Sequence, residues 1–256
     1  MYGSLEMLFK EGKRKALTLS YDDNTIHDRK LVQLMNNYGI QGTFNLNSGS
    51  FSQKDQRVIN GIDTDFSRID AEEVKDLYRG HEVASHTVTH PSLTAIPSNM
   101  GVAEVIKDRQ NLEELTGELV RGFAYPYGTY NEAVEEILSV CGIEYARTVV
   151  STESFDLPQD FLEWHPTCHH DSPKLMELAK QFCDGEDGKV KLFYLWGHSY
   201  EFAQNNNWQK LEDFFQYISK DAESIWMATN IEILEYVKAF RELKRSTDGR
   251  ILYNPT

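Results

Sequence analysis

The sequence predicts an α/β fold in the form of a (β/α) barrel, and three observations lead to this prediction. Strand-like and helix-like segments alternate along nearly the whole chain, which is the pattern of parallel strands joined by crossover helices. About eight strand candidates fall within the 256 residues, which suits a barrel better than an open sheet. Polar clusters directly follow several strands, where the chemistry of such barrels is located.

The composition favours one globular domain spanning residues 1–256. Apolar residues make up 40% of the chain and charged residues 26%, which is enough for a sizeable core, and no repeat or linker divides the sequence. The 40 acidic residues exceed the 26 basic ones, for a net charge of −14. Such a surface repels phosphate backbones and anionic lipids, so we expect no nucleic-acid or membrane partner. The composition does not predict an oligomeric state.

The N-terminal residues and the cysteines predict a cytoplasmic location. In the first 20 residues the charges follow the short apolar stretch, and no small-residue cleavage site is present, which argues against a signal peptide. Cys141, Cys168 and Cys183 are odd in number and form no CxxC pair, so we expect reduced thiols. No apolar run reaches the roughly 18 residues that a membrane-spanning helix needs.

The first strands and helices follow from hydrophobic periodicity and capping residues. Lys15–Tyr21 alternates and then becomes apolar, as a buried strand does. Asp28–Tyr38 has apolar residues at helical spacing and ends at Gly39. Gly42–Leu46 predicts a second strand, so the chain begins as strand, helix, strand.

The middle of the chain continues this alternation. Asp70 is a predicted helix N-cap with Glu73 three residues later. Glu82–Ser85 predicts a short strand, and Val102–Thr116 predicts an amphipathic helix that Gly117 closes. The remaining predicted strands are Gly122–Tyr125, Tyr145–Val149, Leu162–His165, Val190–Leu195 and Ser224–Ala228. The remaining predicted helices are Glu132–Val140, Leu211–Ser219 and Asn230–Leu243.

Two polar clusters at strand ends predict a metal site. Asp22 and Asp23 end the first strand, and adjacent carboxylates cost energy unless a cation or proton resolves them; the simpler interpretation is a helix N-cap. His86 and His90 follow the third strand, four residues apart, and both can reach one cation; alone, such a pair is a weak signal. Together they offer two imidazoles and a carboxylate, the ligand set of one divalent transition metal, most simply Zn²⁺, with Co²⁺, Ni²⁺ or Mn²⁺ as alternatives.

Two further strand ends carry groups suited to catalysis. The turn Tyr125–Gly128 is stiffened by Pro126, and such a turn can present backbone N–H groups to an oxyanion. The apolar strand late in the chain ends at His198, which suits a general acid because the pKa of histidine lies near neutrality. The simpler interpretations are an ordinary loop and a structural histidine.

These clusters, in this order, resemble the motifs of the polysaccharide deacetylase family, the NodB-homology carbohydrate esterases. Ser20–Asp23 (SYDD) is similar to its T-F/Y-D-D motif, and His86–His90 (HTVTH) matches H-S/T-x-x-H in full. Tyr125–Gly128 (YPYG) is similar to the third motif, R-x-P-Y/F-G, but Ala124 stands at the position of the arginine. Leu195–His198 is similar to the Leu-x-His motif, with one extra residue.

The resemblance extends from about Lys15 to about Tyr236 and implies a distorted barrel of about seven parallel strands, the NodB-like deacetylase barrel. It implies removal of an N-acetyl or O-acetyl group from a sugar or oligosaccharide, and of the two we favour N-acetyl. It assigns Asp23, His86 and His90 as metal ligands.

For catalysis, the resemblance assigns Asp22 as general base, the backbone N–H of Tyr127 as oxyanion donor and His198 as general acid. Protonation by the acid matters because an amide anion is far too basic to leave unprotonated.

The chain departs from the family at two motifs. The arginine that holds the catalytic aspartate is missing at Ala124, and Arg121 is a candidate replacement. The D-x-x-D-W motif, whose aspartate orients the acid histidine, is also missing. His169, His170 and Asp171 stand in that region, and we expect one of the two histidines to reach the pocket.

Several residues are candidates for substrate contact. They are Tyr125, Pro126, Asn47, Trp196, His169 and Trp164. For the tryptophans the simpler interpretation is core packing, and for Asn47 it is turn chemistry.

Two other functions remain open from the sequence. A metal-dependent hydrolase of a non-sugar C–N amide on the same barrel would release other products than acetate. A non-catalytic sugar-binding barrel would bind without turnover, but it has no use for a base, three ligands and an acid together.

Overall fold

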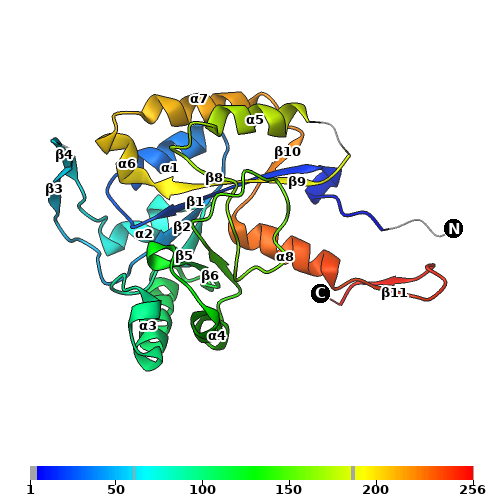
Figure 1. The fold of residues 1–256 in the computed structure, drawn as a ribbon, viewed down its shortest axis with the longest axis horizontal. Helices are drawn as coiled ribbons and strands as arrows, with labels where there is room; N and C mark the ends of the chain where they lie inside the picture. The colour runs from blue at the N-terminus through cyan, green and yellow to red at the C-terminus, as the bar shows by residue number, and fades with distance from the viewer. Residues whose placement is uncertain (1–4, 60, 186–187, 256) are drawn as a thin grey trace.

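The computed structural model describes residues 5–59, 61–185 and 188–255. Its centre is a curved, all-parallel sheet with the strand order β7-β6-β5-β2-β1-β9-β8, and β10 pairs with the start of β1 (Figure 1). This confirms the distorted barrel of about seven parallel strands. The strands are β1 (Lys15–Asp22), β2 (Thr43–Leu46), β5 (Glu82–Ser85), β6 (Gly122–Ala124), β7 (Tyr145–Arg147), β8 (Cys168–His169), β9 (Lys191–His198) and β10 (Ile225–Met227).

Helices cover both faces of this sheet. Figure 1 shows α1, α5, α6 and α7 on one side and α3, α4 and α8 on the other. The helices are α1 (Asp28–Asn37), α2 (Val74–Leu77), α3 (Ser98–Thr116), α4 (Glu132–Val140), α5 (Leu175–Asp184), α6 (Ser199–Gln204), α7 (Trp208–Ser219) and α8 (Asn230–Arg241). Among the described residues, none of the helices combines the length and apolar character that crossing a bilayer requires.

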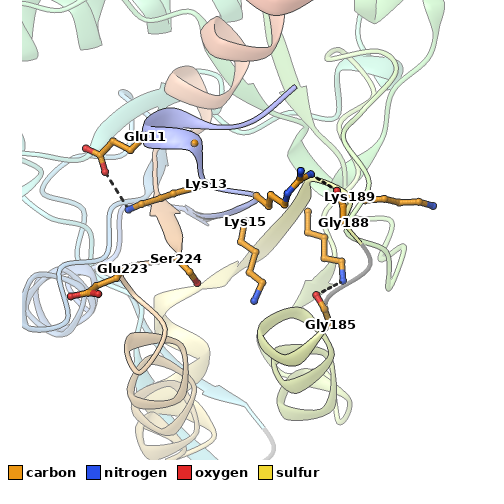
Figure 2. A pocket seen from close by; sticks show the side chains of 11 residues that line it. Glu11, Lys13, Lys15, Gly185, Gly188, Lys189, Glu223 and Ser224 are labelled. Atoms are coloured by element: carbon orange, nitrogen blue, oxygen red, sulfur yellow. Dashed lines mark hydrogen bonds and ion pairs between the residues drawn. The ribbon is translucent and has the colours of Figure 1, made fainter. Parts of the chain in front are cut away.

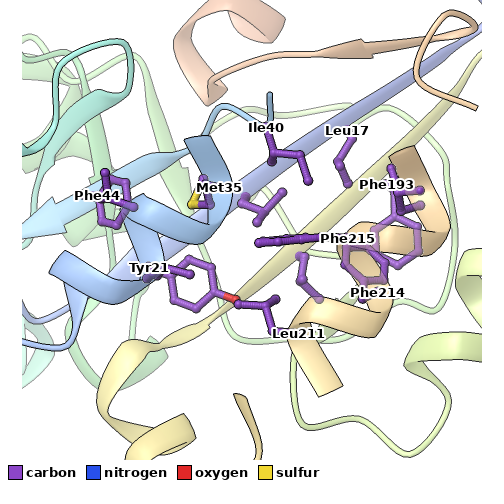
Figure 3. Packing of buried hydrophobic residues seen from close by; sticks show 14 of the residues in the cluster. Leu17, Tyr21, Met35, Ile40, Phe44, Phe193, Leu211, Phe214 and Phe215 are labelled. Atoms are coloured by element: carbon purple, nitrogen blue, oxygen red, sulfur yellow. The ribbon is translucent and has the colours of Figure 1, made fainter. Parts of the chain in front are cut away.

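The core lies between the sheet and these helices. Alternate residues of β1 point to opposite faces, so Leu17, Leu19 and Tyr21 pack against α1 and α7. Phe214 and Phe215 of α7 are fully buried in the same cluster (Figure 3). Burial of these aromatic side chains removes a large apolar area from water and fixes α7 against the sheet.

Most predicted elements are present with small changes at their ends. The predicted capping box of Asp70 and Glu73 forms, although it opens a 3₁₀ turn that leads into the short α2. The helix predicted from Val102 begins at Ser98, directly after Pro97, and ends at Gly117 in the left-handed conformation. The strand predicted at 190–195 extends to His198, because β9 pairs with β1 along its whole length.

One predicted strand is wrong. The segment predicted as a strand at Leu162–His165 forms only an isolated bridge, between Trp164 and Arg147. The actual strand, β8, lies just after it at Cys168–His169 and pairs with β9. The segment crosses from β7 to β9, so only part of it runs along either neighbour.

Two hairpins were not predicted. The strands β3 (Gln56–Ile59) and β4 (Ile62–Asp65) form an antiparallel hairpin that projects beside the C-terminal end of the sheet (Figure 1). The strands β11 (Lys244–Arg245) and β12 (Leu252–Tyr253) form another near the C-terminus. Both are short and exposed, so neither has the apolar pattern that predicts a buried strand.

Candidate active site

A cavity of about 770 Å³ opens at the C-terminal ends of β1, β5 and β9. Its lining residues are Asp22, Asp23, Arg57, Arg68, His86, Thr89, His90, Tyr125, Tyr127, Gly128, Val149, Trp196, His198 and Tyr200. The strands run parallel, so residues at their C-terminal ends converge although they are far apart in sequence. The structure thus brings together the proposed base, acid, oxyanion donor and metal ligands.

A second cavity, of about 710 Å³, lies near the starts of β1 and β9, the opposite end of the strands (Figure 2). Its lysines are engaged with the protein itself: Lys15 pairs with Asp221 at 3.2 Å, and Lys13 reaches the carbonyl of Ile225 at 3.3 Å. None of the predicted site residues lines it.

Asp22 is the buried centre of the active-site cavity. One carboxylate oxygen, Oδ1, accepts a hydrogen bond from Asn45 at 2.8 Å. The other, Oδ2, lies 3.9 Å from Nε2 of both His86 and His198. Burial alone would raise the pKa of Asp22, but Arg147 and the two histidines outweigh it and lower that pKa. Asp22 is therefore ionised at neutral pH and can accept a proton.

Arg147 holds Asp22 from the end of β7, a strand that does not pair with β1. Its Nη2 donates to Asp22 Oδ2, and its guanidinium stacks over Trp196 with 4.3 Å to the ring centre. Arg147 is fully buried at the end of β7, where it is the register partner of Ala124 on β6. The family's arginine is missing at Ala124, and the guanidinium of Arg147 on the adjacent strand β7 provides the positive charge instead.

Arg121, the predicted replacement, lies elsewhere. It pairs with Glu144 at 3.2 Å and with Glu235, and it does not line the cavity. The prediction that Arg121 holds Asp22 is wrong. Arg121 immediately precedes β6, at the end of that strand opposite to the cavity.

Asp23, His86 and His90 form a donor set that fits a divalent transition metal. One ligand atom from each lies within 4.8 Å of the others, and His90 Nε2 is 3.8 Å from Asp23 Oδ1. His86 Nδ1 donates to the carbonyl of Ala124 at 2.7 Å, which leaves its Nε2 lone pair free. Burial lowers the pKa of His86 and that of His90, the latter to about 4, so both rings are neutral as metal ligation requires.

The backbone around this donor set is held in unusual conformations. Asp23, Asn24, Thr87, His90 and Tyr127 all have positive φ angles, which non-glycine residues rarely adopt. Such strain persists only where surrounding contacts impose it, and it concentrates at functional sites.

Tyr127 lies in the 3₁₀ turn Pro126–Gly128, which directly follows β6. Its ring is exposed and packs edge-on against His90, with 4.6 Å between the centroids. The N–H groups of Gly128 and Thr129 close this turn on the carbonyls of Tyr125 and Pro126, at 2.8 Å and 3.3 Å, so the N–H of Tyr127 is not used to close it. Its neighbour Pro126 is buried and does not line the cavity, whereas Tyr125 does.

His198 is held by a carboxylate that the sequence analysis missed. Glu201, three residues later at the start of α6, accepts from the backbone N–H of His198 at 3.1 Å and lies 3.3 Å from its Nδ1. Burial alone would lower the pKa of His198, but Glu201 outweighs it and raises that pKa to about 9. His198 is therefore protonated at neutral pH, as a general acid must be.

His169 and His170 also contact the carboxylate of Glu201. Their Nε2 atoms lie 3.1 Å and 3.2 Å from Glu201 Oε2. Burial opposes ionisation of Glu201, but its bonds to His169 and His198 lower its pKa. Neither His169 nor His170 lines the cavity, so the prediction that one of them reaches the pocket is wrong. They support Glu201 instead.

Two of the predicted substrate contacts are committed to the protein itself. The amide of Asn47 donates to the carbonyls of His86 and Thr87, at 2.5 Å and 3.0 Å. Trp164 is fully buried against Tyr145 and Phe161. Neither lines the cavity, so the expectation of substrate contact is corrected: Asn47 supports the histidine loop and Trp164 is part of the core.

Trp196 does line the cavity. Its indole nitrogen is buried and has no hydrogen-bond partner among the described residues.

The residues that the sequence analysis missed share a weak local signal. Arg147 lies inside the predicted strand Tyr145–Val149, and Glu201 stands three residues after His198, the spacing of a capping box. Asp108 accepts from Ser85 and from the N–H of His86, at 2.6 Å and 3.2 Å, so it anchors the start of the histidine loop from α3.

The chain was compared with known families and structures. A family model described as polysaccharide deacetylase matches residues 9–146, which is more than half of the chain. A comparison with curated protein sequences found no match.

Solved structures share the fold at low sequence identity. A protein from Mycobacterium smegmatis, provisionally named a polysaccharide deacetylase, is 16% identical with a TM-score of 0.67, over 95% of this chain and 96% of that one. A family 4 carbohydrate esterase from Streptomyces lividans, in complex with acetate, is 15% identical with a TM-score of 0.54, over 84% and 93%.

A third similar structure shows that the fold alone does not establish activity. It is a pseudoenzyme of carbohydrate esterase family 4 from Bacillus anthracis, 15% identical with a TM-score of 0.56, over 86% of this chain and 66% of that one. The function of the present chain must therefore be argued from its own residues.

Proposed function

Since the chain belongs to the polysaccharide deacetylase family, we propose that it is a metal-dependent deacetylase that removes an acetyl group from a sugar or oligosaccharide. The observation that carries the proposal is the position of Asp22. It is ionised, buried and within 3.9 Å of both His86 of the donor set and His198. A base, an acid and a ligand set thus meet in one cavity.

Each of the proposed roles rests on one local arrangement. Asp23, His86 and His90 would hold one divalent transition metal, with Zn²⁺ the simplest choice. When bound there, such an ion supplies Lewis-acid chemistry at the acetyl group and at water. Asp22 accepts the proton of the attacking water, and Arg147 keeps this carboxylate ionised and oriented.

Tyr127 and His198 act on the tetrahedral oxyanion and on the leaving group. The backbone N–H of Tyr127 donates to the oxyanion. His198 donates its Nε2 proton to the leaving nitrogen, while Glu201 holds Nδ1 and favours the protonated ring. This arrangement favours an N-acetyl over an O-acetyl substrate, because an amine leaves only when protonated.

Tyr125, Trp196 and Tyr200 line the cavity beside these groups. Aromatic faces suit the apolar faces of a sugar ring. We therefore place the acetylated sugar ring between the turn Tyr125–Gly128 and the end of β9.

The test is acetate release from N-acetylated oligosaccharides by wild type, Asp22→Asn and Asp213→Asn. Loss of the general base is expected to lower the rate by about a hundredfold or more. Asp213 is an exposed residue of α7, so its variant controls for the removal of a negative charge and should match wild type. Full activity in Asp22→Asn, or no acetate from any acetylated carbohydrate, contradicts the proposal.

A further inference from the structure

The rim of the active-site cavity carries positive charge in a chain that is strongly acidic. The chain has 40 acidic and 26 basic residues. Yet the carboxylates that line the cavity are only Asp22 and Asp23, the proposed base and metal ligand, whereas Arg57 and Arg68 also line it. Neither arginine is needed for the proposed chemistry, so their presence calls for a separate explanation.

Both arginines come from the β3–β4 hairpin and the residues that follow it. Arg57 lies in β3, and Arg68 forms an isolated bridge with Thr25 just after the end of β1. Figure 1 shows this hairpin beside the C-terminal end of the sheet, the end at which the cavity opens. The hairpin therefore forms one wall of the approach to the catalytic residues.

An aromatic stack fixes this wall relative to the proposed acid. The guanidinium of Arg57 lies over Phe66, 4.6 Å from the ring centre. Phe66 packs against Tyr200 with 4.4 Å between centroids, and Tyr200 lies 5.2 Å from His198. A group bound at the arginines is thus held at a defined position with respect to His198.

The two arginines differ in how far the protein compensates their charge. Arg57 pairs with Asp55, using Nε and Nη2 on one carboxylate oxygen at 2.7 Å and 2.6 Å. Arg68 uses Nη1 to bond the backbone carbonyl of Asp23, and within the described part of the chain it has no carboxylate partner. Its Nε and Nη2 bond to no described protein group, which leaves two adjacent donors for a ligand.

We infer that the substrate carries an anionic group, a carboxylate or a phosphate, and that Arg68 with Arg57 binds it while the acetyl group occupies the catalytic residues. Two donors of one guanidinium match the two oxygens of either anion. This inference rests on the proposed function and adds the class of substrate. It makes Arg68 a specificity-determining residue and the β3–β4 hairpin the element that presents it.

A matched substrate series tests the inference. The substrates are N-acetylglucosamine, its 6-phosphate and its uronic acid, each with the same acetyl group and differing in charge. Wild type should show a higher kcat/KM for at least one charged substrate than for the neutral one. The phosphate and the uronic acid then distinguish the two kinds of anion. Added salt should lower the rate on the preferred anion and spare the neutral sugar.

The variants are Arg68→Gln, Arg68→Lys and Arg29→Gln. Arg68→Gln should lower kcat/KM for the charged substrate by about tenfold or more relative to its effect on the neutral one, as for lost hydrogen bonds to a charged group. Arg68→Lys should retain part of the preference for the charged substrate, because lysine keeps the positive charge but lacks the paired N–H donors of a guanidinium. Arg29 pairs with Glu73 on the surface, away from the cavity, so Arg29→Gln controls for the loss of a cation.

Arg68 also bonds the carbonyl of Asp23, so a purely structural role is the alternative. In that case Arg68→Gln would lower the rates on neutral and charged substrates equally and reduce metal content. That result overturns the inference, as does an equal wild-type rate on all three sugars. Absence of acetate from every sugar would instead count against the proposed function.

Discussion

At the scale of single residues, the proposed catalysis depends on how Asp22 is held. Its two oxygens are bonded by Asn45 of β2 and Arg147 of β7, and its pKa is lowered although it is buried. A buried carboxylate without such partners would be neutral and a poor base. Arg147 is therefore the residue whose loss should affect the base most.

Arg147→Met removes this cation and replaces it with a side chain of similar length. The pKa of Asp22 should rise, so the low-pH limb of the kcat/KM profile should move to higher pH, and the rate should fall by about a hundredfold. Removal of one partner of a buried pair is also expected to cost about 3–5 kcal/mol of stability. The measurement is the pH–rate profile, with thermal unfolding alongside.

Two further variants keep this test decisive. Arg147→Lys keeps the charge and should retain a low-pH limb closer to wild type. Arg121→Met removes a partly exposed arginine that pairs with Glu144 and Glu235, so it should cost no more than about 1 kcal/mol and leave the profile unchanged. If Arg121→Met changed the profile and Arg147→Met did not, the assignment would be reversed.

The sequence predicted the site residues that belong to local motifs and missed those set by pairing between strands. Asp22, Asp23, His86 and His90 stand in short patterns at strand ends, and all line the cavity. Arg147 becomes a partner of Asp22 only because β7 lies beside β6 in a register that places it opposite Ala124. That register depends on the packing of the whole sheet, which no short sequence pattern contains.

At the scale of elements, the first turn of α6 has both a structural role and a proposed catalytic role. His198 ends β9 and is the N-cap of α6, and Glu201 completes a capping box with it. The same carboxylate that satisfies the helix N-terminus raises the pKa of the proposed acid. In the proposed mechanism, Glu201 at this helix start takes the orienting role that the resemblance gives to the missing D-x-x-D-W aspartate.

Glu201→Gln keeps the size of the side chain and an oxygen for the cap, but it removes the charge. The acid works when protonated, so kcat/KM should fall as pH rises through the pKa of His198, raised to about 9 by Glu201 in the wild type. In Glu201→Gln that fall should begin at lower pH. A pH–rate profile measures it directly.

A second capping box in the chain provides the control for Glu201→Gln. Glu232 completes an equivalent capping box with Thr229 at the start of α8. Glu232→Gln should cost a similar, small amount of helix stability and leave the pH profile unchanged. Identical profiles for wild type and Glu201→Gln would show that Glu201 has only a capping role.

Among the elements that the sequence analysis did not predict, the hairpins have no periodic apolar face, whereas α5 has one, with Leu175, Leu178 and Phe182 buried. The β3–β4 hairpin is largely exposed, so neither strand alternates between apolar and polar residues in the manner of a half-buried strand. The segment around Trp164 has the apolar composition of a strand, but its hydrogen bonds cross from β7 to β9. Long buried strands such as β1 were predicted because both of their faces contact the core.

At the scale of the whole molecule, the parallel sheet explains why the site assembles at one end. The ligand set combines the end of β1 with the loop after β5, and the acid comes from the end of β9. Between β1 and β5 lies only β2, and β9 is the other neighbour of β1. Adjacent strand ends therefore bring residues separated by more than a hundred positions into one cavity.

Metal content per chain, measured after purification without added metal, is the decisive test of the proposed metal site. Wild type should hold about one transition-metal ion, as a three-ligand site of this kind does. His90→Ala should lose it, and Asp22→Asn should keep it, because Asp22 is bonded to Arg147 and Asn45 and lies outside the ligand set. A wild type that holds no metal and takes up no zinc, cobalt or nickel would contradict the account.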